Sequence, residues 1–372
     1  MNKIKISALI MALAMAVTPI ANAATFTDMP ADERSAVAIE NAVKNGLISG
    51  YEDNTVRPDN NIKRSEMAVI ISQACKVTKE GDISRFVDVK EGDWFYSAMA
   101  KAYEMGAFSG DDMNQMNPNN NITFQDCFTV LSQVFDLVPS YVYYPKAEDM
   151  PTNLTAGQLA SGKRVYDISC LDKFADKDSI AKWAIPYVAG VVHHGGWDGI
   201  DGNITPTAYI TRAQFSIVMD NIIKNYIDEP GTYTAENFPQ GTTMIRCNDV
   251  VLNGIVADSD IYVGDSVEPG KITVDNITAN KRFIVRGCAT PEMDTKVYGI
   301  KATGYIYSYR AIRPFISSDI SGATTGIGFY AVPGCYTSFA IPGTETPDKT
   351  EGSVVIDTKA DADKDAENTD EK

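Results

Sequence analysis

The sequence has little of what nucleic-acid-binding and metal-dependent proteins use. It has two histidines, and its six cysteines form no CxxC pair, so we expect neither a zinc site nor a thiol redox motif. Acidic residues outnumber basic ones by 49 to 33, and the net charge of −16 repels nucleic acid and anionic lipid. The Asp-rich loops lack the ligand spacing of a calcium-binding EF-hand loop, and turn chemistry explains them better. We therefore expect no metal, no cofactor and no nucleic-acid partner.

Long apolar runs are also scarce. One run, Ile6–Val17, follows two lysines and precedes the small-residue sequence Ala21-Asn22-Ala23, a pattern that predicts a signal peptide over residues 1–23. The run is too short to span a bilayer comfortably, and an uncleaved anchor is the alternative. No other stretch is long and apolar enough to cross a membrane. We expect a secreted chain with no transmembrane segment in its mature form.

The number of cysteines is even, which in an exported chain permits disulfides without requiring them. Cys75 and Cys127 lie in helical apolar patterns, where a buried free thiol is the expected state. A bridge between Cys247 and Cys288 stays open as an alternative for that pair.

Internal repetition is the strongest positive signal. Segments of the form F-x-D (FTD, FVD and FAD) begin at Phe26, Phe86 and Phe174, at intervals of 60 and 88 residues. Three landmarks that shift together indicate three copies of one structural unit. The other two sets with the same intervals are Pro58, Pro118 and Pro206, and Ile62, Ile122 and Ile210.

Each unit has the pattern of two helices joined by a polar loop. Apolar residues at helical spacing predict a first helix, and a glycine stops it, as a left-handed C-terminal cap requires. A second glycine follows four residues later, and the second helix begins near IKRSE, ITFQD or ITRAQ. One unit is too small to bury its own apolar face, so we expect the three to share one core. The positions are Ala38, Ile39 and Ala42, with counterparts Ala98, Met99 and Ala102, and Tyr187, Val188 and Val191; the stopping glycines Gly46, Gly106 and Gly195; and the second glycines Gly50, Gly110 and Gly199.

The start of the second helix carries a capping pattern. Thr211 and Gln214 match the S/T-x-x-E/Q capping box, in which the two side chains bond each other's backbone N–H groups. Thr123 and Asp126 approximate the same device, and the first unit keeps only Glu66. Capping explains these residues without a ligand.

Arg64 and Arg212 are not explained by helix formation. Both occupy the first helical position, where the positive end of the helix dipole disfavours a cation by roughly 0.3–1 kcal/mol. A helix N-terminus with an arginine beside it is a good receptor for a carboxylate or phosphate. The alternative is a salt bridge to an acidic residue of a neighbouring unit.

These motifs resemble those of S-layer homology (SLH) domains, over roughly Phe26–Ile223. The F-x-D openings, the paired glycines and the ITRAQ-type motif carry the resemblance. It implies a pseudo-threefold helical spindle whose grooves between units bind secondary cell-wall polymers, commonly through a pyruvylated sugar. It also implies that the motif arginine of the family corresponds to Arg64 and Arg212, and its first-helix tryptophan to Trp94 and Trp183.

The units also depart from the family pattern. Phe124 stands where the second unit should have its arginine, and Arg34 or Ser35 where the first should have its tryptophan. We therefore expect one or two competent grooves rather than three. Core packing between helices is the alternative role of the tryptophans. The candidate carbohydrate-binding residues are Arg64, Arg212, Trp94, Trp183, Lys63, Gly50, Gly110 and Gly199.

After Ile223 the composition becomes strand-like, and YIDEPGTYT is interpreted as a linker. Ile261, Ile272 and Ile284 are 11 and 12 residues apart, which suits the rungs of a small β-solenoid or the strands of a compact sandwich. The region is also similar to β-solenoid modules that follow SLH repeats in other surface proteins. Residues 344–372 are acidic and poor in apolar residues, which predicts a disordered tail.

The patterns together predict an α+β multidomain protein, in which an all-α spindle of three helix–loop–helix SLH units precedes a mostly β domain. The expected segments are a signal peptide (1–23), SLH repeats (24–84, 85–136 and 173–225), an insert with no assigned role (137–172), a β-rich module (226–343) and the acidic tail (344–372).

The predicted function is non-covalent anchoring of an S-layer or surface structural protein to an anionic, pyruvylated secondary cell-wall polysaccharide. Peptidoglycan is the alternative partner, and self-assembly into a surface layer is a further expectation. The β region has no histidine, no nucleophile elbow and no aspartate cluster beside a basic residue, so we expect no enzyme. A wall-anchored adhesin, or a polysaccharide-active enzyme carried by the β-module, is the alternative.

Overall fold

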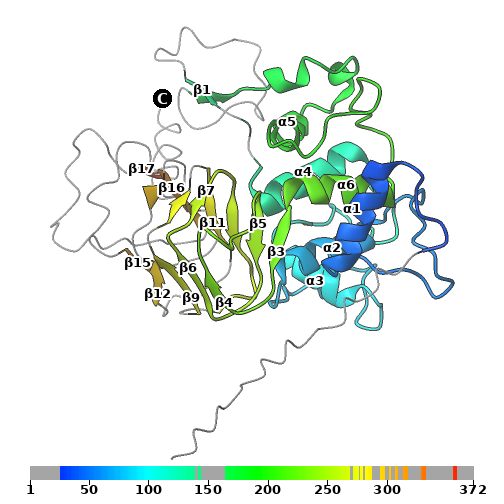
Figure 1. The fold of residues 1–372 in the computed structure, drawn as a ribbon. Helices are drawn as coiled ribbons and strands as arrows, with labels where there is room; N and C mark the ends of the chain where they lie inside the picture. Colours follow the sequence, from blue (N-terminus) through cyan, green and yellow to red (C-terminus); the bar gives the residue numbers. More distant parts are fainter. Residues whose placement is uncertain are drawn as a thin grey trace, which may run out of the picture.

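The computed structural model describes residues 26–137, 139, 141–143, 164–268 and 271–286 apart from 276 and 280, and beyond these a series of strands between 294 and 357. Within this part of the chain, three pairs of helices lie beside a stack of parallel strands (Figure 1). The pairs are α1 (Glu33–Lys44) with α2 (Arg64–Cys75), α3 (Tyr96–Glu104) with α4 (Phe124–Phe135), and α5 (Ile185–His193) with α6 (Arg212–Ile222).

The first helix of each unit buries the face that the spacing predicts. Each helix is followed by a glycine in the left-handed region, with φ of 66° at Gly46, 75° at Gly106 and 74° at Gly195. The glycine caps are therefore confirmed. The buried residues are Ala38, Ile39 and Ala42 in α1, Met99 and Ala102 in α3, and Val188 and Val191 in α5, while Ala98 and Tyr187 are half-buried.

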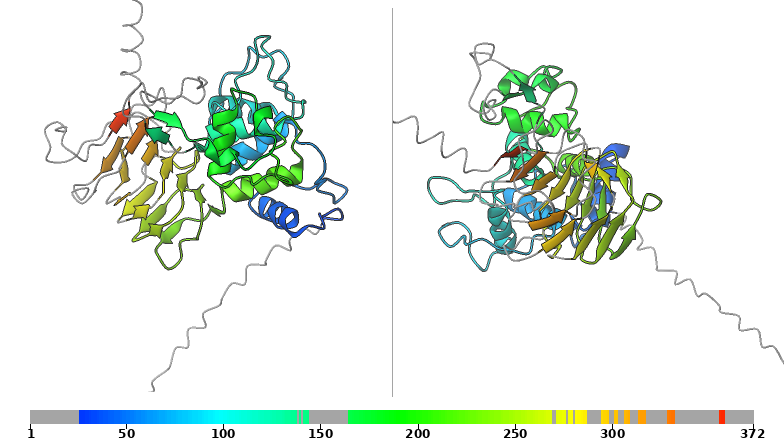
Figure 2. Two further views of the ribbon diagram at one scale, coloured as in Figure 1. Left: turned by 90° about the horizontal axis from the view of Figure 1, so that it is seen from above. Right: turned by 90° about the vertical axis from the view of Figure 1, so that its left-hand side faces the viewer.

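The helix pairs close into a ring. The first helix of each unit packs on the second helix of the preceding unit: α3 on α2, α5 on α4, and α1 on α6. One cluster of buried apolar residues runs through all three units, as the small size of each unit requires. Figure 2 shows the helices grouped on one side of the strands.

Three isoleucines form a cyclic set of backbone hydrogen bonds where the second helices begin. The N–H of Ile62 donates to the carbonyl of Ile210 (3.0 Å), that of Ile210 to Ile122 (3.2 Å), and that of Ile122 to Ile62 (3.1 Å). All three side chains are at most 1% exposed. The set relates the starts of α2, α4 and α6 by one pseudo-threefold axis.

Between α4 and α5, β1 (Tyr141–Tyr143) pairs antiparallel with β2 (Arg164–Tyr166), and two short 3-10 helices, η3 (Ser169–Leu171) and η4 (Lys177–Ser179), follow. Later strands pair in parallel, in the orders β3-β5-β8-β11-β14-β16-β17, β4-β6-β9-β12-β15 and β7-β10-β13. Their bounds are β3 (Asn225–Ile227), β4 (Gly231–Tyr233), β5 (Thr243–Ile245), β6 (Val250–Asn253), β7 (Val256–Ala257), β8 (Ile261–Val263), β9 (Ile272–Asp275), β10 (Thr278–Ala279), β11 (Phe283–Val285), β12 (Asp294–Val297), β13 (Lys301–Ala302), β14 (Ile306–Ser308), β15 (Arg313–Ile316), β16 (Gly328–Ala331) and β17 (Val355–Asp357).

The expected rung spacing of 11 to 12 residues is wrong. Ile261 and Ile272 lie in β8 and β9, which belong to different sheets. Within one sheet Ile261 pairs with Phe283, 22 residues further on, and Ile284 stands opposite Tyr262. Between β8 and β11 the chain passes through two other sheets, in β9 and β10, so the repeat is about twice as long as the apolar spacing suggests.

The strands and the helices share one core. Met244, Tyr262 and Ile284 are neighbours in register on β5, β8 and β11, and they belong to the same buried cluster as the helices. The Tyr262 hydroxyl donates to the carbonyl of Phe135 at the end of α4 (2.7 Å). The expected linker over residues 226–234 is also wrong, because β3 and β4 occupy it and Ile227 is buried.

Three buried arginines of the β region satisfy carbonyls at helix C-termini. Arg246 donates to Gln73 of α2 (3.2 Å) and to Asn45 after α1 (3.1 Å). Arg282 and Arg286 donate to carbonyls at the end of α4. Cations suit the negative end of a helix and the carbonyls that lack a partner within it. The β region therefore packs directly against the helical half and supplies hydrogen-bond donors to the ends of its helices.

Several expectations fall on parts of the chain that the structure does not describe, including the signal peptide and most of the tail. Val355–Asp357 in the expected tail forms β17, which pairs in parallel with β16, so the prediction of disorder does not hold for these three residues. Cys75 and Cys127 are buried free thiols, as expected; Cys247 is also free, and Cys288 lies outside the described residues. In the described segments no helix has the length and hydropathy to cross a membrane, and no cluster of His, Cys, Asp and Glu is placed to hold a metal ion.

Candidate functional site

The F-x-D aspartates hold the loops that border the grooves between units. Asp88 accepts hydrogen bonds from the backbone N–H groups of Met116 (2.9 Å) and Asn117 (2.7 Å), one on each carboxylate oxygen. Asp28 and Asp176 make the same pair of bonds in the other two units, at 2.7 to 2.8 Å. The second amide belongs to a residue with positive φ, 53° at Asn117, which is an unfavourable conformation for any residue but glycine. Each aspartate therefore stabilises a turn that would otherwise be strained.

The first N–H groups of each second helix are already bonded. In α2, the N–H groups of Arg64 and Ser65 donate to the carbonyls of Asn120 (3.0 Å) and Pro118 (2.9 Å), in the loop of the second unit. The starts of α4 and α6 bond the loops of the third and first units in the same way. The expectation that these helix N-termini receive an anion is therefore wrong for the backbone amides, and only the arginine side chains are left for that role.

Capping accounts for the third residue of each second helix, as predicted. The Thr211 hydroxyl accepts from the N–H of Gln214 (3.3 Å), and the Gln214 side chain accepts from the N–H of Thr211 (2.9 Å). Glu66 accepts from the N–H of the residue before α2 (2.8 Å). Asp126 accepts from the hydroxyl of Thr123 (2.6 Å).

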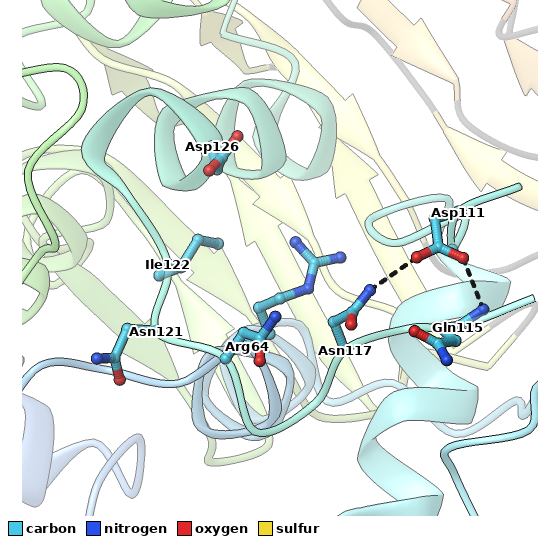
Figure 3. A pocket seen from close by; sticks show the side chains of 9 residues that line it. Arg64, Asp111, Gln115, Asn117, Asn121, Ile122 and Asp126 are labelled. Carbon is cyan, nitrogen blue, oxygen red and sulfur yellow. Dashed lines mark hydrogen bonds between the residues drawn. The ribbon is translucent and has the colours of Figure 1, made fainter. Parts of the chain in front are cut away.

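Arg64 reaches a cleft between the first and second units (Figure 3). Its Nε donates to the carbonyl of Met116 (2.9 Å), and its guanidinium lies over the ring of Phe108, 4.4 Å from the ring centre. The two terminal NH₂ groups have no hydrogen bond or ion pair among the described residues. Burial lowers the pKa of Arg64 below its ordinary value, but an arginine stays protonated in a protein.

The cleft has a volume of about 340 Å³, and most of the side chains that line it are polar. The guanidinium of Arg64 lies between Asp126 on one side and Asn117 with Asp111 on the other (Figure 3). The amide of Asn117 donates to Asp111 (3.0 Å), which keeps both in place. The arrangement offers one cation, two carboxylates and several amides, which suits a polar, hydroxylated ligand such as a saccharide.

Arg212 occupies the equivalent groove between the third and first units but is 7% exposed. Its Nε donates to the carbonyl of Val56 (2.9 Å) and its Nη2 to that of Ser49 (3.3 Å). Its Nη1 lies 3.6 Å from the carboxylate of Glu66. The salt bridge to a neighbouring unit, the alternative role for these arginines, is thus the one that Arg212 takes.

Aromatic packing fills the third groove. Phe124, at the arginine position of the second unit, is 1% exposed. Its ring centre lies 5.2 Å from that of Trp197 and 5.7 Å from that of Phe128. Phe124 itself brings no cation to this groove, and the nearby guanidinium of Arg34, 5.8 Å from the ring centre of Trp197, is paired with Asp198. The three grooves therefore differ in chemistry although their backbones are alike.

Comparison with known families agrees with this arrangement. The S-layer homology domain family matches residues 25–68, 85–126 and 173–216. Each match runs from the F-x-D segment to the start of the second helix. The chain carries three S-layer homology domains.

Similar proteins include surface-layer proteins and polysaccharide-degrading enzymes. The Surface-layer 125 kDa protein of Lysinibacillus sphaericus is 26% identical over 266 residues, which cover 70% of this chain and 20% of that protein. The Surface layer protein of Brevibacillus choshinensis is 28% identical over 148 residues, 38% of this chain and 13% of that protein. Exoglucanase XynX of Acetivibrio thermocellus is 25% identical over 201 residues, 54% of this chain and 16% of that enzyme.

This chain thus spans a fifth or less of each of these relatives. The SLH domains and the surface-layer relatives identify a secreted, cell-surface protein with a role in cell-wall anchoring. SLH domains bind cell-wall polymers, which agrees with the polar lining of the Arg64 cleft.

Three other predicted residues do not line the Arg64 cleft. Trp94 and Trp183 are 67% and 51% exposed, and neither lines it. Lys63 is exposed directly before Arg64 but does not line it either. Core packing is therefore not the role of these tryptophans, and their contact with a ligand stays a prediction.

The second glycine of each SLH domain has a packing role. A Cβ on Gly50 would lie 2.0 Å from the ring of Phe26, so only glycine lets the F-x-D phenylalanine pack there. Gly110 and Gly199 also lie against their own phenylalanines, from which a Cβ would be 2.2 and 2.6 Å away. Gly110 also lines the Arg64 cleft.

Sequence reasoning missed the cleft residues Asp111 and Asn117 and the role of the F-x-D aspartates. A signal for the aspartates was present: in every SLH domain they precede the two amides that they bind by 28 and 29 residues. Asp111 and Asn117 carried no such signal, since they belong to an Asp- and Asn-rich loop that resembles an ordinary turn.

Proposed function

We propose that this protein anchors non-covalently to the cell wall by binding an acidic secondary wall polysaccharide in the Arg64 cleft, between the first and second SLH domains. The observation that carries the proposal is the guanidinium of Arg64, whose terminal NH₂ groups have no partner among the described residues. A planar guanidinium can donate two parallel hydrogen bonds to a carboxylate, such as that of a pyruvylated sugar. Peptidoglycan is the alternative ligand.

In this proposal the ligand binds in one cleft rather than in all three grooves. Arg212 is engaged by Glu66 and two carbonyls, and Phe124 is packed against Trp197. A single charge-assisted contact contributes roughly 1.5–3 kcal/mol, so one protein molecule binds one polymer site weakly. Assembly of many copies into a surface layer would raise the retention of each, and that self-assembly is part of the proposal.

For the β region we propose a β-solenoid with a structural rather than a catalytic task. The parallel pairing of every third strand along the chain, β5 with β8 and β8 with β11, supports the solenoid form. The match with the Surface-layer 125 kDa protein covers 70% of this chain and so extends beyond the three SLH domains, whereas the match with the exoglucanase covers 54%. The likeness to the surface-layer protein therefore includes part of the β region.

Sedimentation of the full chain with purified wall sacculi tests the proposal, and the full chain is used because helices and strands share a core. We expect the protein to pellet with intact sacculi but not with sacculi stripped of their polysaccharide. Arg64→Gln should weaken the apparent affinity at least tenfold, about 1.4 kcal/mol. Lys90→Gln, which removes an exposed positive charge that does not line the cleft, is the matched control.

Two outcomes would contradict the proposal. Retention on stripped sacculi would indicate peptidoglycan as the ligand. Wild-type affinity in the Arg64→Gln protein would show that the cleft is not the binding site.

A further inference from the structure

Two grooves of the SLH ring each have an arginine and an acidic residue at equivalent positions, but only one of these two pairs forms an ion pair. In each, the arginine that opens one second helix faces the third residue of the next second helix around the ring. In the groove between the third and first domains, Arg212 lies 3.6 Å from Glu66, so the two charges compensate each other. In the groove between the first and second domains, Arg64 and Asp126 form no ion pair within 4 Å, although the structure describes both.

Arg64 has no ion pair with Asp126 for two reasons: the side chain of Asp126 is one methylene group shorter than that of Glu66, and it makes a hydrogen bond within its own domain. Aspartate is shorter than glutamate, and Asp126 is held towards its own helix by the hydroxyl of Thr123 (2.6 Å). It therefore stands apart from Arg64 across the cleft (Figure 3). The groove that contains Asp126 is therefore open, whereas the groove that contains Glu66 is closed by the ion pair between Glu66 and Arg212.

A second carboxylate lies on the other side of the guanidinium. Asp111 accepts from the N–H groups of Met113 and Gln115 (2.9 Å each) and from the side chain of Asn117 (3.0 Å). The hydrogen bond from Gln115 holds the pKa of Asp111 below its ordinary value, so this carboxylate is ionised. At the equivalent position the closed groove has Tyr51, whose hydroxyl lies 3.5 Å from Glu66.

The charges of the open cleft therefore do not suit a purely anionic ligand. One guanidinium attracts an acidic group, but two carboxylates beside it and a chain of net charge −16 repel one. A ligand that carries both signs would suit these charges, with its acid on the guanidinium and its cation beside one of the two carboxylates, which lie on opposite sides of that guanidinium. The volume of about 340 Å³ leaves room for such a group between the separated charges.

We infer that the Arg64 cleft recognises a zwitterionic saccharide, in which an acidic substituent meets Arg64 and the free, protonated amine of an amino sugar meets Asp126. This inference rests on the proposed function and narrows its ligand from any acidic wall polysaccharide to one with unacetylated amines. Asp126 sets this selectivity, because its length keeps the cleft from closing on itself.

Chemical modification of the ligand separates the inference from the function on which it rests. The probes are the polysaccharide released from sacculi of the producing cells, the same polymer N-acetylated with acetic anhydride, and the polymer with its carboxyl groups converted to methyl amides. We expect both modifications to weaken binding of the full chain about tenfold, 1.4 kcal/mol. If only the loss of carboxyl groups weakens binding, the function stands and the zwitterionic ligand is refuted. If neither does, the proposed function fails as well.

Two variants of Asp126 test its role. Asp126→Asn removes the charge, and Gln214 at the equivalent helix position shows that an amide is compatible with the fold. Asp126→Glu keeps the charge but can reach Arg64 as Glu66 reaches Arg212. Both should lose the preference for the free-amine polymer over its N-acetylated form.

The matched control is Asp112→Asn, an exposed residue of the same loop that does not line the cleft. It should keep the wild-type preference, and equal thermal unfolding of all variants would establish that they fold. Wild-type preference in both Asp126 variants would refute the inference, because the carboxylate would then serve only the helix cap.

Discussion

Replacing Asp88 by alanine tests whether an F-x-D aspartate builds the binding cleft. Asp88 accepts two backbone hydrogen bonds, from Met116 and Asn117. Bonds to a charged acceptor contribute about 1.5 kcal/mol each at the lower end, so the free energy of unfolding should fall by about 3 kcal/mol. The same loop supplies the carbonyl that holds Arg64, so wall binding should fall as well.

Asp28→Ala is the matched control for Asp88→Ala. Asp28 makes the same two bonds in the first SLH domain, but its loop borders the closed groove of Arg212. Urea denaturation followed by circular dichroism should show equal losses of stability, and sedimentation with sacculi at a temperature where both are folded should show weaker binding only for Asp88→Ala. A stability loss below about 1 kcal/mol, or equal loss of binding in both variants, would refute the reasoning.

Two further predictions concern stability. Gly50→Ala should lower the free energy of unfolding by about 3 kcal/mol in urea, because its Cβ would overlap the Phe26 ring, whereas Gly46→Ala, with open space around it, should cost about 1 kcal/mol; equal costs would contradict the packing role. Burial raises the pKa of Asp136 to about 7. At this position the folded chain therefore keeps a proton that the unfolded chain loses near pH 4, so Asp136 contributes stability that is lost as the pH rises from about 4 to about 7. Asp136→Asn should flatten this slope, and an unchanged slope in urea titrations across that range would count against it.

Features that depend on local pattern could be predicted from the sequence. The repeat intervals, the apolar face of each first helix, the glycine caps and the Thr211 capping box need only neighbouring residues, and the structure has all of them. The rung spacing of the β region could not be predicted, because the distance between apolar residues does not say which strands pair.

The prediction of a linker over residues 226–234 was wrong for a related reason. Its glycine and proline suggest a connection, but Arg246, Arg282 and Arg286 tie the following strands to the helix ends. These arginines lie far from the helices in sequence, so no local pattern indicates the contact.

The sequence by itself determined three SLH domains, the positions of their helices and a chain that belongs at the cell surface. Arg64 and Arg212 are equal in that description, since both open a second helix. Only the tertiary structure decided that Arg64 faces an open cleft while Arg212 is buried against Glu66. The physical reason is that each arginine faces an acidic side chain of another domain in the ring: Glu66 is long enough to pair with Arg212, whereas Asp126 is shorter and is held by Thr123.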